Sequence, residues 1–198
     1  VKDGEGKITG NGYENEAYML VEITPPATLA AGTTVKLTAT AEWLMCLTVC
    51  MPGEAKLELS LPAAAAGSAD AKWTQAITDA RAKLPDASTG WALTATHDGT
   101  TATLRLRPQA GTTHQPKELH FFAADGFTDY AKPAVVRADN GGWVLELPLD
   151  AAADKATARL TGVLASANGW AEGAGYDGLA IDVPFTKDAP KTAAVTAP

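Results

Sequence analysis

Cys46 and Cys50 are the only cysteines in this 198-residue chain, and their spacing restricts how the surrounding segment can fold. A disulfide holds its two Cα atoms about 4.4 to 6.8 Å apart. Four steps along an extended strand would separate them by roughly 13 Å. If the two cysteines pair, the chain must therefore turn between them.

The small ring that such a disulfide closes bears on its function. Loop entropy gives a ring of this size about 2 kcal/mol of stabilisation, less than the roughly 3 to 5 kcal/mol expected for longer loops. Strained or exposed disulfides are the labile, regulatory or catalytic ones. The sequence therefore favours a redox-active pair over a structural staple. It predicts that Cys46 and Cys50 pair within the chain and are reduced under mild conditions.

A metal site built on the two thiols is a further alternative. Two thiolates four residues apart can bind copper or zinc, but a closed site needs additional Cys or His ligands at short spacing. The histidines all lie far downstream, at His97, His114 and His120. His97 adjoins the Asp98-Gly99 turn, which predicts a solvated hairpin residue rather than a ligand. We therefore expect no bound metal and no other cofactor.

The composition excludes several classes of partner. The formal net charge is −7 and the pI is about 4.9, so no basic surface is available to bind nucleic acid or an anionic membrane. Nearly half of the residues are hydrophobic, 46%, which is enough for a globular core. No run approaches the roughly 20 apolar residues that cross a bilayer. The chain starts at Val1 without a signal peptide, so we expect a mature or excised segment.

Two alternating runs flank the cysteines. Residues 33–42 and 55–61 alternate between apolar and polar side chains, which is typical of half-buried strands. Because the connection between them is short, residues 46–54 are predicted to join two antiparallel strands. The cysteines would then lie at one end of a sheet, where a partner can reach them.

The part of the chain before the cysteines is predicted to hold few strands. Residues 17–24 form one more apolar run, which Pro25 and Pro26 end. About four strands fit between Ile8 and Leu61, fewer than a stable sandwich usually has. Either further strands precede this unit, or it borrows an edge from the second domain or from a neighbouring chain.

The rest of the chain predicts a second β unit with a leading helix. Ser68 or Asp70 can cap a helix that runs to about Leu84, with Trp73 and Ile77 on one face. The predicted strands are 91–97, 101–107, 118–123, 143–147, 157–164 and 179–185. The expected fold class is mainly β, with two immunoglobulin-like β-sandwich units. The expected domains are a partial unit over 1–62, a linker over 63–69, a second unit over 70–186 and a tail over 187–198.

The residues around the cysteines also resemble a known family. The resemblance is to the periplasmic N-terminal region of DsbD-type and ScsB-type thiol:disulfide interchange proteins, and it is strongest from Gly12 to Pro62. DsbD spaces its cysteines more widely, so the chain is more similar to the ScsB-like branch. The motifs are Gly12-Tyr13-Glu14, the run Trp43-Leu44-Met45-Cys46 with Cys50-Met51-Pro52-Gly53-Glu54, Leu57 to Pro62, Ala80 to Pro85, and Gly162-Val163-Leu164.

This resemblance implies a fold, a location and a reaction. It implies immunoglobulin-like domains in the periplasm that work without a cofactor, as a component of a protein-disulfide reductase. Reducing equivalents would come from a membrane-embedded redox domain of the same full-length protein. They would pass to thioredoxin-like periplasmic proteins, an electron transfer that this kind of protein links to cytochrome c biogenesis.

The resemblance also assigns roles to the two cysteines. Cys46 and Cys50 would cycle between dithiol and disulfide through a mixed disulfide with each partner. Cys50 is expected to join the partner, because it lies at the exit of the turn beside Pro52 and Gly53, where little side-chain bulk blocks approach. Cys46 would then resolve the mixed disulfide.

Four neighbouring residues are predicted to support the loop. Trp43 is expected to fill a core rather than to form a docking surface. Pro52 is expected to fix the exit of the turn, and Tyr13 to pack beside the disulfide. Glu54, together with Glu42, would place negative charge beside the loop and disfavour the thiolates. The second unit shows no catalytic constellation and is predicted to be a spacer or a docking module.

Overall fold

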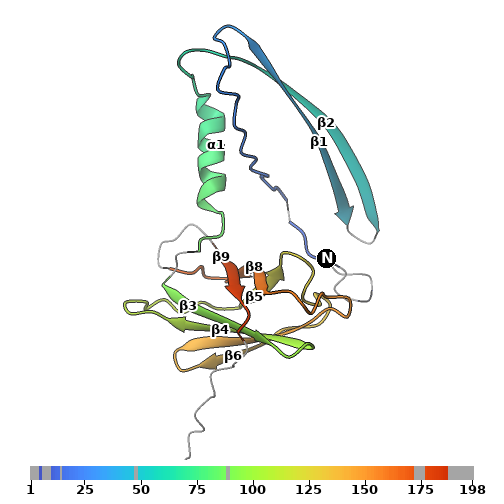
Figure 1. The fold of residues 1–198 in the computed structure, drawn as a ribbon, viewed down its shortest axis with the longest axis vertical. Coiled ribbons are helices and arrows are strands. Elements are labelled where there is room, and N and C mark those ends of the chain that lie inside the picture. Colours follow the sequence, from blue (N-terminus) through green and yellow to red (C-terminus); the bar gives the residue numbers. More distant parts are fainter. Residues whose placement is uncertain are drawn as a thin grey trace, which may run out of the picture. The chain divides into compact units, whose positions relative to one another are not determined.

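The protein is mainly β, with one helix in the part of the chain that the structure describes (Figure 1). The computed structural model describes Glu5 and residues 10–13, 15–46, 49–87, 90–171 and 177–186. Glu14 and the predicted tail over 187–198 lie outside these residues. The backbone contacts divide the chain into two compact units between Arg81 and Ala82.

The first unit contains a long β-hairpin. Strands β1 (Thr34–Cys46) and β2 (Cys50–Pro62) pair antiparallel without a bulge, from Thr34 opposite Pro62 to Cys46 opposite Cys50. Both strands fall where alternating side chains predicted them. Each successive pair of opposed residues is called a rung below.

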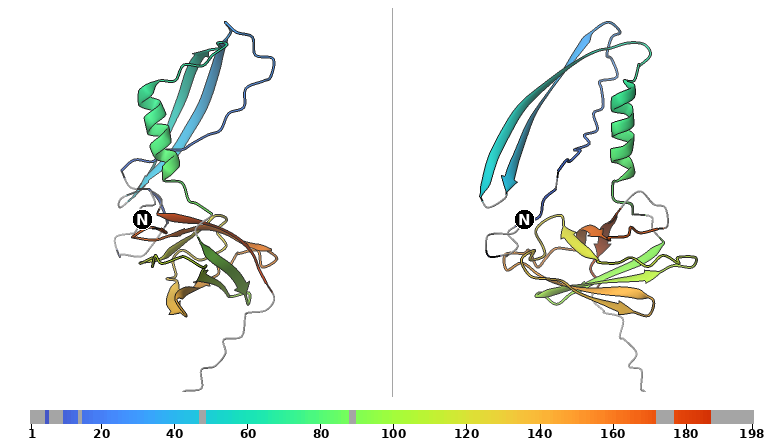
Figure 2. Two further views of the ribbon diagram at one scale, coloured as in Figure 1. Left: turned by 90° about the vertical axis from the view of Figure 1, so that its left-hand side faces the viewer. Right: turned by 180° about the vertical axis from the view of Figure 1, so that it is seen from behind.

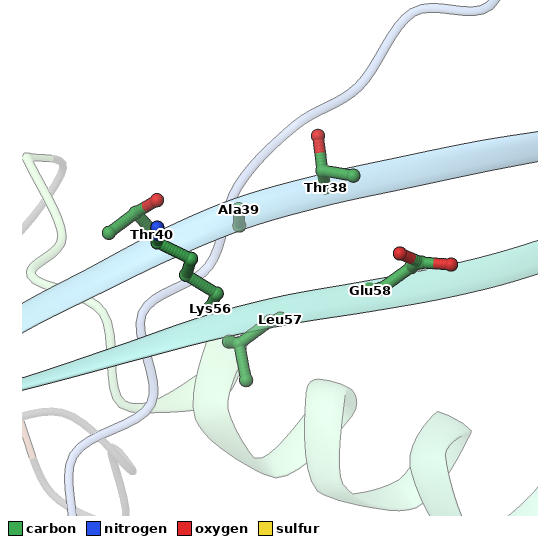
Figure 3. Close-up of a pocket in the computed structure, with 6 residues that line it drawn as sticks. All are labelled: Thr38, Ala39, Thr40, Lys56, Leu57 and Glu58. Atoms are coloured by element: carbon green, nitrogen blue, oxygen red, sulfur yellow. The ribbon is translucent and has the colours of Figure 1, made fainter.

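Strand geometry gives the hairpin two chemically different faces. Because side chains alternate across a strand, every second rung shares a face. Figure 3 shows Thr38, Thr40 and Lys56 on the opposite side of the ribbon from Leu57. The first face, called the apolar face, consists of Val35, Leu37, Ala39, Ala41, Trp43, Met45, Met51, Gly53, Ala55, Leu57, Leu59 and Leu61. The second, called the disulfide face, carries the two cysteines.

The strand predicted over residues 17–24 does not form, and that prediction was wrong. Within the described residues the sheet of the first unit has two strands, not the four expected between residues 8 and 61. Tyr18, Met19, Val21 and Ile23 stay exposed. Apolar residues of high β propensity make a strand only where a neighbouring edge accepts their backbone hydrogen bonds. Here the segment is paired with neither edge of the hairpin.

Helix α1 (Ala71–Ala82) forms where the sequence predicted a helix. Asp70 caps it, since its Oδ1 accepts hydrogen bonds from the backbone N–H groups of Lys72 and Trp73 at 2.9 and 3.1 Å. No residue of α1 is buried. The predicted apolar face is therefore uncovered, with Trp73 56% and Ile77 38% exposed.

As far as the structure describes it, the second unit is a β-sandwich of seven strands in two antiparallel sheets (Figure 2). One sheet has the order β3-β4-β7-β6 and the other β5-β8-β9. The bounds are β3 Trp91–His97, β4 Thr101–Pro108, β5 His120–Ala123, β6 Val135–Asp139, β7 Gly142–Pro148, β8 Arg159–Ala165 and β9 Gly178–Pro184. Sequence alternation predicted all of these strands except β6.

Inward-facing leucines and two tryptophans fill the sandwich. Leu104, Leu145 and Leu160 come from different strands and are fully buried. Trp170 packs edge-on against Trp91 with 6.0 Å between ring centroids, and its Nε1 donates a hydrogen bond to the carbonyl of Leu164 at 3.0 Å. The buried core cluster of the described residues lies in this unit, so the stability of the fold is concentrated there.

Candidate redox site

The candidate site is a disulfide at the tip of the first unit's hairpin. Cys46 and Cys50 are joined by an S–S bond of 2.04 Å, with their Cα atoms 4.0 Å apart. They form the last rung before a connection of three residues, 47–49, of which 49 is described. The predicted pairing and the predicted turn between the cysteines are both confirmed.

The hairpin register explains how so short a spacing permits a disulfide. Directly opposed residues of antiparallel strands have Cα atoms about 4.5 to 5.5 Å apart, close to what a disulfide needs. The strands therefore bring Cys46 and Cys50 together through their own backbone pairing. The disulfide ties the turn end of the hairpin and does not cross between elements of a core.

The two sulfur-bearing residues differ in accessibility. Cys50 is exposed, whereas Cys46 is half-buried. Around them, Leu44 is 67% and Val49 71% exposed. A partner protein can therefore approach the tip, and it meets Cys50 more readily than Cys46.

Trp43 does not fill a core, contrary to the prediction. Its side chain is 43% exposed. It lies opposite Gly53 in the register, and a Cβ atom at Gly53 would overlap the indole ring. The bare backbone of Gly53 is therefore the surface on which Trp43 packs.

Two further supporting residues lie elsewhere than predicted. Pro52 is inside β2, opposite Leu44, and does not form the exit of the turn. A proline is tolerated there because β2 is an edge strand whose outward positions need no N–H donor. Tyr13 is 82% exposed, so it does not pack beside the disulfide.

The two glutamates lie together but away from the cysteines. Glu42 and Glu54 are opposed to each other in the register, four residues from the cysteine rung. That separation is roughly 13 Å along the strands. At physiological ionic strength the Debye length is about 8 Å, so their charge acts only weakly on the sulfurs.

The fold itself matches a solved periplasmic domain. The N-terminal periplasmic domain of ScsB from Proteus mirabilis superposes with a TM-score of 0.53 and 21% identity. The match covers 76% of this chain and 58% of that one. The chain has the fold of the ScsB N-terminal periplasmic domain. No protein-family model matches the sequence, and no curated protein matches it.

This match confirms the expected resemblance at the level of the fold. The residues around the cysteines resemble the ScsB-like branch, and the matched structure is a ScsB domain. The mainly β, immunoglobulin-like fold class is confirmed with it. At this identity, chemistry does not follow from the likeness. The chain spans 58% of the ScsB domain's length.

The histidines of the ScsB-like fold belong to the second unit. His97 is half-buried between Phe127 and Phe185, whose ring centroids lie 6.1 and 4.5 Å from its own. The prediction of a solvated hairpin residue was therefore wrong for His97, because the end of β3 lies under these rings. His114 Nε2 lies 3.0 Å from the carbonyl oxygen of Gly169. No group of three or more His, Cys, Asp or Glu side chains in the described residues could hold a metal.

Two further observations bear on where a site could lie. The hollow drawn in Figure 3 is lined at mid-hairpin by Thr38, Ala39, Thr40, Lys56, Leu57 and Glu58. It includes residues of both faces and lies far from the cysteines, so we assign it no role. Among the described residues, no helix is long and apolar enough to span a membrane.

The sequence analysis did not single out Leu44 as an exposed neighbour of the disulfide. It lies opposite Pro52, one rung of the disulfide face away from the cysteines. The signal was present in the alternation of β1, where Thr38, Thr40 and Glu42 predict a polar residue at position 44.

Proposed function

We propose that this chain is a periplasmic thiol–disulfide exchange domain that relays reducing equivalents through Cys46 and Cys50. The observation that carries the proposal is the placement of the disulfide on an exposed hairpin tip, outside any core. A structural staple typically links buried elements, whereas this bond closes a small ring and is open to attack. The matched ScsB domain is periplasmic, which supports the proposed periplasmic location of this chain.

In the first half of the proposed cycle the disulfide accepts two electrons. A donor thiolate attacks Cys50 Sγ, the Cys46–Cys50 bond breaks, and Cys46 leaves as a thiolate. A second donor thiolate then attacks the donor sulfur of the mixed disulfide and releases Cys50. The donor ends as a disulfide and the chain as a dithiol. We assign the donor role to a membrane-embedded redox domain of the full-length protein.

In the second half the electrons pass to an oxidised partner. The Cys50 thiolate attacks the partner's disulfide and expels one partner thiolate, which leaves a mixed disulfide. The Cys46 thiolate then attacks Cys50 Sγ, reforms the intramolecular bond and releases the reduced partner. The greater exposure of Cys50 supports its role as the sulfur that joins the partner, and thioredoxin-like periplasmic proteins are the proposed acceptors.

A trapping experiment tests this assignment. The Cys46→Ser variant lacks the resolving thiol, so it should accumulate a mixed disulfide with an oxidised thioredoxin-like protein. The Cys50→Ser variant should not. Non-reducing gels and mass spectrometry would report the adduct. Equal trapping by both variants would remove the assignment of Cys50, and no trapping by either would count against exchange.

A further inference from the structure

The polar side of the hairpin changes character beside the disulfide. From the open end of the ribbon, the rungs of the disulfide face pair Thr34 with Pro62, Lys36 with Ser60, Thr38 with Glu58, Thr40 with Lys56 and Glu42 with Glu54. The next rung is Leu44 opposite Pro52, and the cysteines follow it. Along β1, the alternation that keeps this face polar is thus broken only beside the disulfide.

The exposure of the apolar Leu44 side chain is energetically unfavourable. This side chain is 67% exposed on a face whose other β1 residues, up to the cysteine, are polar. A break of a local sequence rule with no packing gain marks functional positions in natural proteins.

The next rung of the disulfide face, on the side of Leu44 away from the cysteines, is also unfavourable in the isolated chain. Glu42 and Glu54 are opposed, and like charges directly across a sheet destabilise it. The ion pair of the described hairpin joins Lys36 to Glu58 at 2.8 Å, and Glu42 and Glu54 form none among the described residues. Two carboxylates therefore point the same way without an ion pair, although Lys56 lies on the neighbouring rung of the same face.

From these two rungs we infer the chemistry of the partner that docks on the tip, on the basis of the exchange function proposed above. The partner has an apolar collar around its reactive cysteine, which covers Leu44 and Pro52. It also has a Lys or Arg roughly 13 Å from that cysteine, which meets Glu42 and Glu54.

The geometry of exchange requires that the partner contact the rungs next to the cysteines, and this contact area is called the footprint. The attacking sulfur must reach Cys50 Sγ, so any protein partner covers the adjacent rung, roughly 7 Å away. Burying Leu44 there contributes to docking. The glutamate rung adds attraction and orientation for a basic group.

Two peptides test the inference. Each carries one cysteine flanked by leucines and has either Lys or Glu four residues from the cysteine, which matches the span to the glutamate rung in an extended chain. Formation of the mixed disulfide with the oxidised protein is followed by mass spectrometry after acid quenching. The Lys peptide should react about two- to fivefold faster than the Glu peptide at low ionic strength. The difference should vanish at about 1 M salt, where the Debye length is about 3 Å.

Variants separate the two parts of the footprint. Glu42→Gln with Glu54→Gln should abolish the preference for the Lys peptide, whereas Glu58→Gln, farther along the same face, should keep it. Leu44→Ser should slow both peptides about three- to tenfold, while Leu57→Ser on the apolar face should not. Dithiothreitol, which has no docking surface, should reduce wild type and variants at equal rates.

The outcomes distinguish this inference from the function on which it rests. If dithiothreitol fails to reduce the disulfide under mild conditions, the exchange function fails and the inference with it. If dithiothreitol reacts, but the two peptides react equally or Leu44→Ser matches wild type, the inference is overturned while the exchange function stands.

Discussion

At the scale of single residues, the turn between β3 and β4 shows how local hydrogen bonds fix a conformation. Asp98 Oδ1 accepts hydrogen bonds from the Thr100 hydroxyl and from the backbone N–H groups of Thr100 and Thr101, at 2.7, 2.8 and 2.8 Å. These donors stabilise the carboxylate and lower the pKa of Asp98 to about 2. The Asp98-Gly99 sequence predicted the hairpin, and the hydrogen bonds explain why it forms.

The lowered pKa of Asp98 predicts a pH dependence of stability. The pKa in the folded protein lies below the ordinary aspartate pKa of 3.8, so the stabilisation is present above about pH 4 and is lost as pH falls towards 2. Because the group is solvent-exposed, the effect should be less than about 1 kcal/mol. Urea unfolding between pH 2 and 5 should show a shallower acid dependence for Asp98→Asn than for wild type. Identical pH profiles would show that these hydrogen bonds persist in the unfolded chain or contribute nothing.

At the scale of elements, the formation of a strand depends both on the hydrophobic pattern of its sequence and on a neighbouring strand to pair with. Alternation predicted β1 and β2, and an apolar run predicted a strand over residues 17–24 that pairs with neither edge of the hairpin. It missed β6, although Asn140 and Gly141, with positive φ of 48° and 79°, form the strongest short hairpin signal in a sequence. Trp43 was misplaced because periodicity shows which face a side chain takes but not whether a second layer covers that face.

The hairpin and its disulfide should be separable from the stability of the sandwich. The buried core cluster contains residues of the second unit and none of β1 or β2, and the disulfide closes only a small ring. Replacing both cysteines by serine should therefore leave the cooperative unfolding of the sandwich unchanged. Any loss in the hairpin should be about 2 kcal/mol or less. Near-ultraviolet circular dichroism reports the Trp91–Trp170 pair, and loss of its signal in the double variant would show that the disulfide is architectural.

At the scale of the whole molecule, the two units differ in how they are stabilised. The sequence predicted a division over residues 63–69 with the helix leading the second unit, and that boundary remains a prediction. The backbone contacts instead divide the chain between Arg81 and Ala82, which groups α1 with the hairpin. The first unit exposes Leu57, Leu59 and Met51, whereas the second buries Leu104, Leu145 and Leu160 completely.

The folding of a fragment tests which of the two boundaries marks the start of the second unit. Residues 82–186 contain every strand of the sandwich, and α1 contributes no buried residue. The fragment should therefore unfold cooperatively, with a midpoint close to that of the 70–186 fragment in calorimetry. If only the longer fragment folds, α1 belongs to the second unit as the sequence suggested.

The reduction potential of the Cys46–Cys50 pair tests the central claim most directly. It is measured by equilibrating the whole chain in dithiothreitol or glutathione redox buffers and counting free thiols after acid quenching. Because the disulfide is exposed and closes a small ring, the expected potential lies above about −300 mV, in the range of exchangeable disulfides. A potential below about −300 mV would identify a structural disulfide and contradict the proposed relay.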